Sequence, residues 1–476
     1  MKILFSSSEV FPFAKTGGLA DVSYALPKAL SNLGHDIKVV MPRYYQIDRN
    51  NLEHIPMVLE VSMGSLGILR AGVFKSYLPK SSVEIYFIDY EDFFGRDGIY
   101  NDKNGFGYPD NDMRFIFFSK AALILAKNLG FSPDIVHAND WQTASQMALI
   151  KKYPEFNNTK GVLTIHNLEH QGIFDKRAMD YLEIGWEHFN PYEFEALGGV
   201  NLLKGGIYFA DKITTVSPTY AKEIQTPEFG FGLDGHIRAH SYKLRGILNG
   251  VDYDEWNPKT DKYIAKNYDI DDMSGKRVCK EDLANIFNVD KNKPIIGLVS
   301  RFAKQKGIEL IASSIYELLH LNANFIFLGS GEKWAEGFFS DLAGKYPNFR
   351  VWVGYSNELA HKIEAGSDYF LMPSLFEPCG LNQIYSLRYG TLPIVRAVGG
   401  LDDTIENFNP YTKEGTGFKF WDATKDALVN TVKWALSTYN TQDYEILQKR
   451  AMQKRFSWEK SAKEYEEVYK KALNGY

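Results

Sequence analysis

Short apolar runs alternate with amphipathic segments along most of this chain, and that alternation restricts the fold more than any other feature. The run at residues 2–6 is followed by apolar residues at helical spacing over 21–33, and then by a second run at 37–42. Strands separated by a helical pattern at this spacing form βαβ units, in which the strands are parallel. The sequence therefore predicts an α/β protein built on parallel sheets.

The alternation is interrupted once, between about residues 250 and 294, and then resumes. The interrupting stretch is polar and contains Asn-Gly, Asn-Pro and Lys/Asp clusters, which is typical of a region between domains. A chain of 476 residues is also too long for one ordinary core, because domains usually have about 100–200 residues. We therefore expect two Rossmann-like doubly wound domains facing a cleft, over residues 1–248 and 249–457. Ligands of such folds bind beyond the carboxyl ends of the strands, so the cleft is the expected site.

Charge and cysteine content exclude several classes of protein. A net charge of −5 argues against a basic stripe for nucleic acid. The two cysteines, Cys279 and Cys379, provide no disulfide framework, so a reducing compartment is expected. The first residues lack the continuous apolar segment of a signal peptide, and no run approaches the roughly 18 apolar residues of a membrane span. These features predict a cytoplasmic protein with neither a nucleic acid nor a membrane as partner.

A loop with paired glycines follows the first expected strand. It reads Lys15-Thr16-Gly17-Gly18 and leads into the helix expected from Asp21. Paired glycines let a ligand approach the backbone closely, and a helix N-terminus offers free N–H groups to an anion. A lysine adds a positive point charge for phosphate. The alternative is an ordinary turn between strand and helix with a solvated lysine.

Two further strands of the first half end in polar residues. Asp140 follows the strand expected at 134–138, and His166 lies at the end of the strand expected at 161–167. An aspartate in this place can be a simple helix N-cap, and a lone histidine is more often structural than catalytic. Because the carboxyl ends of parallel strands share one edge of the sheet, their equivalent positions favour a functional role.

The second half carries a sharper signal of the same kind. Arg301 and Lys306 follow the strand expected at 294–300, and Glu377 follows the strand expected at 368–373. A diphosphate leaving group gains negative charge as its bond breaks, and fixed Arg and Lys side chains stabilise that charge without a metal. The alternative is a solvated basic loop.

A second Gly-Gly-Leu stretch, residues 399–401, follows the strand expected at 392–396. The loop that carries Glu377 is expected to start a helix at Gly380, whose backbone N–H groups hold phosphate while Glu377 reaches sugar hydroxyls. The second glycine pair again allows a ligand close to the backbone. We therefore expect the two Gly-Gly-Leu stretches, one in each domain, to face the same ligand.

The sequence contains no specific motif for binding a nucleotide cofactor or a metal ion. The dinucleotide motif G-x-G-x-x-G and the P-loop motif do not occur in the sequence. The stretch Asp252-Tyr253-Asp254 matches the D-x-D pattern of metal-dependent glycosyltransferases, but a three-residue pattern often arises by chance. No cluster of His and Cys has zinc-binding spacing. We expect neither a metal nor a cofactor.

Taken together, these stretches resemble bacterial glycogen synthase and plant starch synthase, a family of retaining glucosyltransferases of the two-domain GT-B type. The resemblance runs in order and at fitting spacings from residue 1 to about residue 410, and it fades in the C-terminal helices. It implies that a last helix, residues 458–476, joins the N-terminal domain. The matching stretches are S-S-E-V-F-P-F-A-K-T-G-G-L-A-D-V, L-G-H-D-I-K-V-V-M-P-R-Y, H-A-N-D-W-Q-T, T-I-H-N-L, G-I-L-N-G-V-D-Y-D-E-W-N-P, S-R-F-A-K-Q-K-G and M-P-S-L-F-E-P-C-G-L-N-Q.

For the first domain, the resemblance implies a site for donor phosphates and for the acceptor. His166 would bond to the donor glucose, Asp140 would face the acceptor side, and Asn249 would sit at the hinge near the donor. The residues implied at the donor phosphates are Lys15, Gly17, Gly18 and Asp21.

For the second domain, the resemblance implies most of the donor site. Arg301 and Lys306 would neutralise the departing diphosphate, Glu377 would orient the donor glucose, and Tyr355 would stack on the nucleotide base. The residues implied to hold the donor through backbone N–H groups are Cys379, Gly380 and Leu381.

The implied activity is transfer of glucose from ADP-glucose to the non-reducing end of glycogen or another α-1,4-glucan, with retention of configuration. Alternatives are a GT-B enzyme with another acceptor or with UDP-glucose as donor, a phosphorylase, and a glucan-binding protein without activity. The catalytic set would be Lys15, Asp140, His166, Arg301, Lys306 and Glu377.

Two positions depart from broader patterns. Many retaining enzymes of this architecture have a second glutamate eight residues after the first, but Tyr385 occupies that position here, as in bacterial glycogen synthases. In H-A-N-D-W, Asn139 stands where a histidine is expected. Because Asp140 is kept, the sequence gives Asn139 no role.

Overall fold

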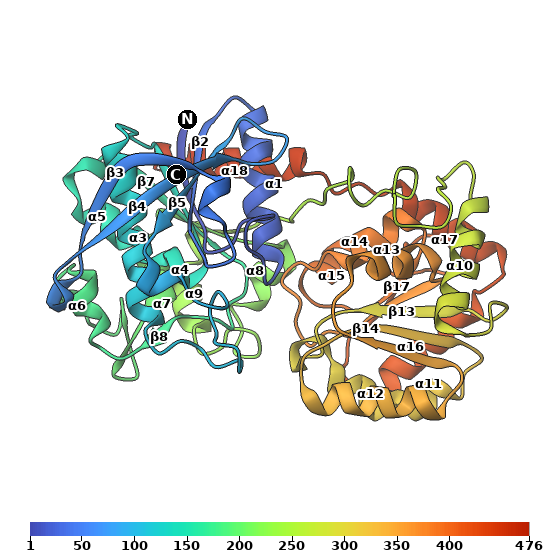
Figure 1. Cartoon of the computed structure of the whole chain (residues 1–476). Helices are drawn as coiled ribbons and strands as arrows, with labels where there is room; N and C mark the ends of the chain where they lie inside the picture. The colour runs from blue at the N-terminus through green and yellow to red at the C-terminus, as the bar shows by residue number, and fades with distance from the viewer. Residues whose placement is uncertain (476) are drawn as a thin grey trace. The chain divides into compact units, whose positions relative to one another are not determined.

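The computed structural model describes residues 1–475, which form two compact units (Figure 1). The first unit comprises Met1–Val216, Ala221–Asn249 and the chain from Trp458 onward, and the second comprises Ser217–Tyr220 and Gly250–Ser457. Each unit is built around its own sheet with helices packed on it.

A nine-stranded sheet forms the centre of the first unit. Every neighbouring pair from β12 to β5 is parallel, whereas β4 is antiparallel to both β5 and β3. From edge to edge the strands are β12 (Leu244–Gly246), β11 (Lys212–Thr215), β7 (Lys160–Ile165), β6 (Ile135–Asn139), β1 (Lys2–Ser6), β2 (Asp36–Pro42), β5 (Glu84–Asp89), β4 (Ile68–Tyr77) and β3 (Glu53–Ser62). A small separate sheet contains β8 (Ile173–Phe174), β10 (Gly199–Asn201) and β9 (Glu195–Ala196).

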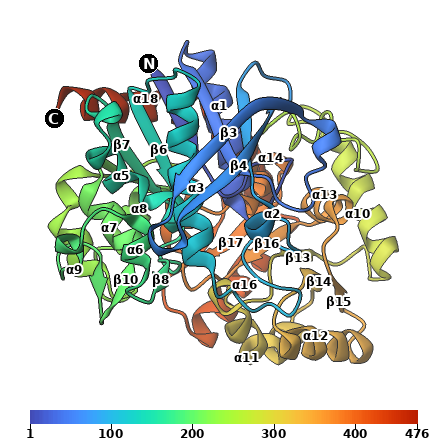
Figure 2. The same ribbon diagram turned by 60° about the vertical axis from the view of Figure 1, so that its left-hand side comes forward.

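Helices cover the first sheet, and the last helix of the chain is one of them. Helix α18 packs beside α1, and α3 packs against β3 (Figures 1 and 2). The helices of this unit are α1 (Gly18–Asn32), α2 (Glu91–Phe94), α3 (Asn111–Asn128), α4 (Asp140–Ala144), α5 (Gln146–Lys152), α6 (Ala178–Leu182), α7 (Leu202–Phe209), α9 (Asp234–Ala239) and α18 (Trp458–Asn474). Helix α8 (Pro218–Glu223) spans a boundary of the division.

A buried histidine ties α18 to the sheet. His137 on β6 is 2.7 Å from the hydroxyl of Tyr469 through Nδ1 and 2.6 Å from that of Thr164 through Nε2. Burial lowers the pKa of His137 to about 3, so the ring is neutral. This histidine therefore has a structural role.

The sheet of the second unit is parallel throughout. Its order across the sheet is β15 (Phe349–Val353), β14 (Asn324–Gly329), β13 (Ile295–Val299), β16 (Tyr369–Met372), β17 (Leu392–Arg396) and β18 (Phe418–Phe420). This is the 3-2-1-4-5-6 order of the doubly wound Rossmann fold. Strand β14 is buried along its whole length, as expected for a strand covered on both faces.

Helices lie on both faces of the second sheet, with α11, α12 and α16 on one and α10, α13 and α14 on the other (Figure 1). In α11, buried Ile308, Ile311, Ile315 and Leu318 follow the helical period and form its inner face. The helices are α10 (Ser274–Phe287), α11 (Ile308–Leu319), α12 (Lys333–Lys345), α13 (Asn357–Gly366), α14 (Asn382–Tyr389), α15 (Gly399–Thr404), α16 (Lys425–Ser437) and α17 (Gln442–Gln453).

The α/β class and the parallel sheets predicted from the sequence are confirmed, with corrections at element ends. Helix α1 begins at Gly18 rather than Asp21, because the glycine loop itself turns into the helix. Helix α14 begins at Asn382 rather than Gly380, because Gly380 adopts a left-handed φ of 73°. Among the residues described, no helix is long and apolar enough to cross a membrane.

Candidate active site

In each unit the strand order reverses next to the first strand, between β1 and β6 in one sheet and between β13 and β16 in the other. Such reversals open a crevice at the carboxyl ends of the two strands, where doubly wound proteins bind ligands. Most of the polar residues singled out from the sequence follow these four strands or the strand next to them.

In the first unit, Lys15 lies on an open loop. Its ammonium is 2.8 Å from the Asp21 carboxylate, and the two side chains are 43% and 30% exposed. An exposed pair of this kind contributes little to stability. Added Cβ atoms on Gly17 and Gly18 would meet no atom within 4 Å, so the glycine pair borders open space.

Glu9, which the sequence did not single out, holds this loop in place. The Glu9 side chain is buried, and its carboxylate accepts hydrogen bonds from the backbone N–H groups of Thr16 and Gly17, at 2.6 and 3.2 Å. It also accepts from the hydroxyls of Thr16 and Tyr100, both at 2.7 Å. Because Tyr100 lies 91 residues away in the chain, only the folded structure reveals this network.

Asp140 occupies a strained position. Its φ is +57°, which is uncommon for a residue with a side chain and is often found at functional sites. Its carboxylate accepts the backbone N–H of His166 at 2.7 Å, so Asp140 joins two strand ends and is not a helix N-cap. Burial raises the pKa of Asp140 to about 7. Hydrogen bonds from the backbone N–H groups of His166 and Asn167 act to lower this pKa, and the charge of Glu9 acts to raise it.

The side chain of His166 is held by Asn139. The ring Nε2 of His166 is 2.9 Å from Oδ1 of Asn139, and Nδ2 of Asn139 donates to the carbonyl of Ser6 at 3.0 Å. Burial lowers the pKa of His166 to about 3, so the imidazole is neutral. The structure therefore groups Asp140, His166 and the end of β1, and it gives Asn139 a contact that the sequence did not reveal.

In the second unit, Lys306 and Glu377 form an ion pair across the reversal of strand order. The Lys306 ammonium is 2.7 Å from Oε2 of Glu377, and the side chains are 19% and 6% exposed. The hydroxyl of Ser374 also donates to Oε2, at 3.0 Å. A shielded charge pair with satisfied hydrogen bonds is far better fixed than a surface pair.

The loop before α11 packs tightly on the loop that carries Glu377. The backbone N–H of Leu375 donates to the carbonyl of Gln305 at 2.8 Å. Gly307 has a left-handed φ of 75°, and a Cβ there would lie 2.1 Å from the carbonyl oxygen of Pro373. Arg301 remains exposed, with its guanidinium 3.4 Å from Oε1 of Gln305. Lys306 and Glu377 are thus brought together, while Arg301 extends into solvent beside them.

The turn from Cys379 to Leu381 precedes α14 and is fastened by one glutamine. The side chain of Gln383 donates to the carbonyls of Cys379 and Gly380, at 2.9 and 3.1 Å. The carbonyls therefore point toward the protein, and the turn leads into the N-terminus of α14. This arrangement suits the predicted role of its N–H groups.

The second Gly-Gly-Leu stretch starts α15 and supports this turn. A Cβ on Gly399 would lie 1.9 Å from the carbonyl oxygen of Glu377, and one on Gly400 would lie 2.1 Å from that of Cys379. The backbone that approaches these glycines belongs to the chain itself. The second glycine pair is therefore a packing contact beneath the Glu377 loop, and its approach to a ligand stays a prediction.

The remaining predicted residues lie apart from these clusters. Tyr355 follows β15 and is 79% exposed, so its ring is open to a ligand. Asn249 is 7% exposed, and its buried Oδ1 has no hydrogen-bond partner. Tyr385 stacks on Trp256 at 4.0 Å between ring centroids, and Trp256 stacks in turn on His361 at 3.7 Å.

The D-x-D stretch forms a local turn. The Asp252 carboxylate accepts the backbone N–H of Asp254 at 2.9 Å, and the hydroxyl of Tyr253 accepts the N–H of Phe456. Within residues 1–475, no group of three or more His, Cys, Asp or Glu side chains is placed to hold a metal ion.

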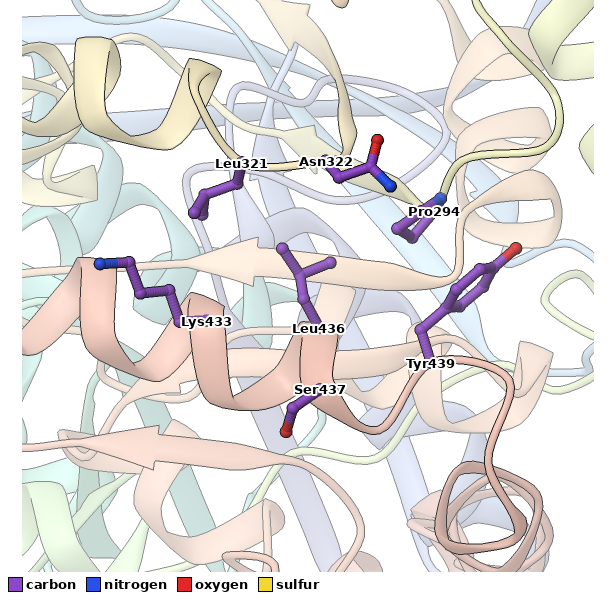
Figure 3. Close-up of a pocket in the computed structure, with 7 residues that line it drawn as sticks. All are labelled: Pro294, Leu321, Asn322, Lys433, Leu436, Ser437 and Tyr439. Atoms are coloured by element: carbon purple, nitrogen blue, oxygen red, sulfur yellow. The ribbon is translucent and has the colours of Figure 1, made fainter.

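A depression of about 340 Å³ lies elsewhere on the second unit (Figure 3). Its residues precede β13 and β14 or lie on or just after α16, so it opens at the amino ends of the strands. It is therefore separate from the polar cluster at the carboxyl ends. Its lining residues are Pro294, Leu321, Asn322, Lys433, Leu436, Ser437 and Tyr439.

Comparisons with known proteins agree with this geometry. Residues 2–239 match the family described as starch synthase catalytic domain, and residues 280–454 match glycosyl transferases group 1. Glycogen synthase 1 of Geobacter metallireducens is 51% identical over 99% of this chain and 96% of its own length. Glycogen synthase of Treponema denticola is 44% identical over 99% of each chain. Both relatives align over nearly the whole chain, so the similarity extends beyond residue 410.

Solved structures give the same result. The catalytic domain of starch synthase IV from Arabidopsis thaliana, bound to ADP and acarbose, superimposes with a TM-score of 0.90 at 31% identity over 99% of each chain. Sucrose-phosphate synthase from Thermosynechococcus elongatus, with a TM-score of 0.64 and 16% identity, shares the fold alone. Two doubly wound units with these matches define a glycosyltransferase of the GT-B fold. More narrowly, the chain belongs to the glycogen synthase and starch synthase family of glucosyltransferases.

Proposed function

We propose that this glucosyltransferase transfers glucose from ADP-glucose to the non-reducing end of an α-1,4-glucan such as glycogen, with retention of configuration. The observation that carries the proposal is the shielded pair of Lys306 and Glu377 beside the exposed Arg301. A protein that only binds an uncharged glucan has no need of such a charged cluster. The ADP and acarbose in the starch synthase structure support a nucleoside diphosphate and a glucan as ligands of this chain.

The positive groups stabilise the leaving diphosphate. Arg301, Lys306 and Lys15 supply the positive charge, and Lys306 is the one held in place by an ion pair. Charge that develops on phosphate oxygens in the transition state is stabilised most by groups that need not reorganise. The ion pair with Glu377 limits the movement of Lys306. The glycine loop of Gly17 and Gly18, followed by α1 and Asp21, lets the backbone reach the phosphates.

The sugar and the base are held by the second unit. Glu377 accepts hydrogen bonds from donor glucose hydroxyls, and the turn over Cys379, Gly380 and Leu381 offers N–H groups at the start of α14. The exposed ring of Tyr355 stacks on the nucleotide base. Asn249, whose buried Oδ1 lacks a partner, acts near the donor.

The transfer step retains the configuration at the anomeric carbon of the donor glucose. The bond from the anomeric carbon to the β-phosphate oxygen breaks, and its electron pair leaves with ADP. The 4-hydroxyl oxygen of the terminal glucose of the glucan forms the new bond on the same face, and its proton passes to the departing phosphate. Asp140 lies toward the acceptor, and His166 hydrogen-bonds to the donor glucose.

We propose further that transfer requires no metal and no cofactor, because cationic side chains supply the charge that a metal otherwise provides. The enzyme acts in the cytoplasm, and exclusion of water from the bound donor suppresses its hydrolysis.

The donor is tested by glucose incorporation into glycogen, with labelled ADP-glucose and UDP-glucose side by side and with EDTA present. We expect strong incorporation from ADP-glucose that EDTA leaves unchanged. Incorporation from UDP-glucose alone would overturn the donor assignment, and loss of activity in EDTA would overturn metal independence. No incorporation from either donor would overturn the proposed function.

A further inference from the structure

Asn139 connects three strand ends at the reversal of strand order in the first unit. It is the last residue of β6, its Nδ2 donates to the carbonyl of Ser6 at the end of β1, and its Oδ1 meets Nε2 of His166 just after β7. Its backbone is also fixed, because the hydroxyl of Thr143 accepts from its N–H and donates to its carbonyl.

These contacts determine where the imidazole carries its proton. The Ser6 carbonyl can only accept, so the atom of Asn139 that faces it must be the amide nitrogen, and Oδ1 must face His166. Because Oδ1 can also only accept, Nε2 of His166 must be the donor. A neutral imidazole has one N–H, and therefore Nδ1 of His166 carries a lone pair.

Asn139 cannot act on substrate directly. Its side chain is fully buried at 0% exposure, whereas His166 is only partly buried. Any effect of Asn139 on the reaction must therefore pass through the orientation and protonation of His166.

We propose that Asn139 is a positioning residue, which holds His166 as the neutral Nε2–H tautomer so that Nδ1 accepts a hydrogen bond from a sugar hydroxyl. An imidazolium has donors at both nitrogens and repels such a hydroxyl hydrogen. The inference rests on the proposed function for the identity of that hydroxyl, but the tautomer does not depend on it. The titratable groups around His166 are the carboxylate of Asp140, which accepts its backbone N–H, and the neutral ring of His137.

The tautomer can be read directly in the free protein. Long-range ¹H–¹⁵N correlation spectra of protein labelled with ¹⁵N-histidine show which ring nitrogen bears the proton, and a His166→Gln variant assigns the signal. We expect a protonated Nε2 and an unprotonated Nδ1 from pH 6 to pH 8. A protonated Nδ1, or an imidazolium within that range, would overturn the proposal whether or not the protein transfers glucose.

The role in the reaction is tested with Asn139→Asp. A carboxylate can still accept from Nε2 of His166, but it loses the hydrogen bond that the amide donates to the Ser6 carbonyl. Its negative charge beside the ring stabilises the imidazolium and raises the pKa of His166. We expect kcat/KM for the donor to fall at least tenfold relative to the unmodified protein at pH 6, and to recover toward pH 8. A pH profile parallel to that of the unmodified protein would contradict the inference.

The matched control is Asn201→Asp. Asn201 is also a buried amide of the first unit, and it accepts the N–H of Lys204 and donates to Gln171. Both variants introduce a buried carboxylate, so a general loss of stability affects both. We expect the control to lower the melting temperature without changing the shape of the pH profile. If both profiles change alike, the effect is structural and the inference fails, while ADP-glucose turnover by the unmodified protein still supports the proposed function.

Discussion

The two Gly-Gly-Leu stretches have the same residues and opposite surroundings. Beside Gly17 and Gly18, added Cβ atoms would meet nothing within 4 Å, whereas at Gly399 and Gly400 they would lie 1.9 and 2.1 Å from carbonyl oxygens of the Glu377 loop. The first pair leaves room for a ligand, and the second leaves room for the protein's own backbone. Identical short motifs at equivalent sheet edges can therefore border open space in one unit and pack on the chain's own backbone in the other.

The charged groups beside these stretches differ in the same way. In the first unit, Glu9 and Asp140 bind backbone N–H groups, and Lys15 stays exposed. In the second unit, Lys306 and Glu377 neutralise each other within a packed loop. The cation of the second region is thus held by its partner, whereas Lys15 of the first region is open to solvent. Each prediction below tests one side of this contrast.

Removing the charge of Lys306 is expected to have the largest effect. Lys306→Gln loses stabilisation of the leaving diphosphate and leaves Glu377 as a shielded carboxylate without its partner, so kcat should fall by about 10²–10³-fold. The measurement is initial rate with labelled ADP-glucose. Lys304→Gln, an exposed lysine on the same short 3-10 turn, is the control and should keep nearly full activity. Equal losses in both variants would mean that only net charge matters.

Gly400→Ala should disturb the support of the Glu377 loop. The new methyl group meets the backbone of Cys379 at 2.1 Å, so the loop must shift, at a cost of about 3 kcal/mol in the free energy of unfolding. Denaturant unfolding and donor KM report the two consequences. Gly344→Ala in α12, where a Cβ meets no atom, is the control and should gain about 0.5–1 kcal/mol. A stable and fully active Gly400→Ala would refute the packing role.

Asp140→Asn should change how stability depends on pH. The pKa of Asp140 is raised to about 7 in the folded protein, so between pH 4 and pH 7 the folded state retains a proton that the unfolded state has lost. Stability therefore falls as pH rises through this window. Asparagine keeps an acceptor for the N–H of His166 without the buried charge. The variant should gain on the order of 2 kcal/mol at pH 8 and nothing at pH 4, as measured by denaturant unfolding. A constant difference at both pH values would contradict the raised pKa.

Gly17→Ala should have the smallest effect on stability. Gly17 has an extended φ of −154° and open space around its Cβ position, so alanine fits and unfolding should change by less than about 0.5 kcal/mol. If donor phosphates approach this backbone, KM for the donor should still rise. A large loss of stability would remove the contrast with Gly400.

The sequence predicted the parallel strands well, because runs such as Ile295–Val299 are continuously apolar and buried on both faces. It did not predict β3, whose Pro56, Glu53 and Glu60 suit an edge strand but weaken any strand pattern.

The site was predicted in part, since strand ends could be located but not their distant partners. Glu9 bonds to Tyr100 and Asn139 bonds to Ser6, contacts that span 91 and 133 residues. No local pattern encodes such distances. The opposite surroundings of the two glycine pairs were missed for the same reason, because packing depends on which loop folds against them.

The most direct test of the proposed reaction is the linkage and position of newly added glucose. Glycogen extended with labelled ADP-glucose is digested with an exo-acting enzyme specific for α-1,4 linkages at non-reducing ends. Retaining transfer to the 4-hydroxyl predicts that nearly all label is released in the first cycles of digestion. Label that resists release would show another linkage, configuration or acceptor position, and would contradict the account.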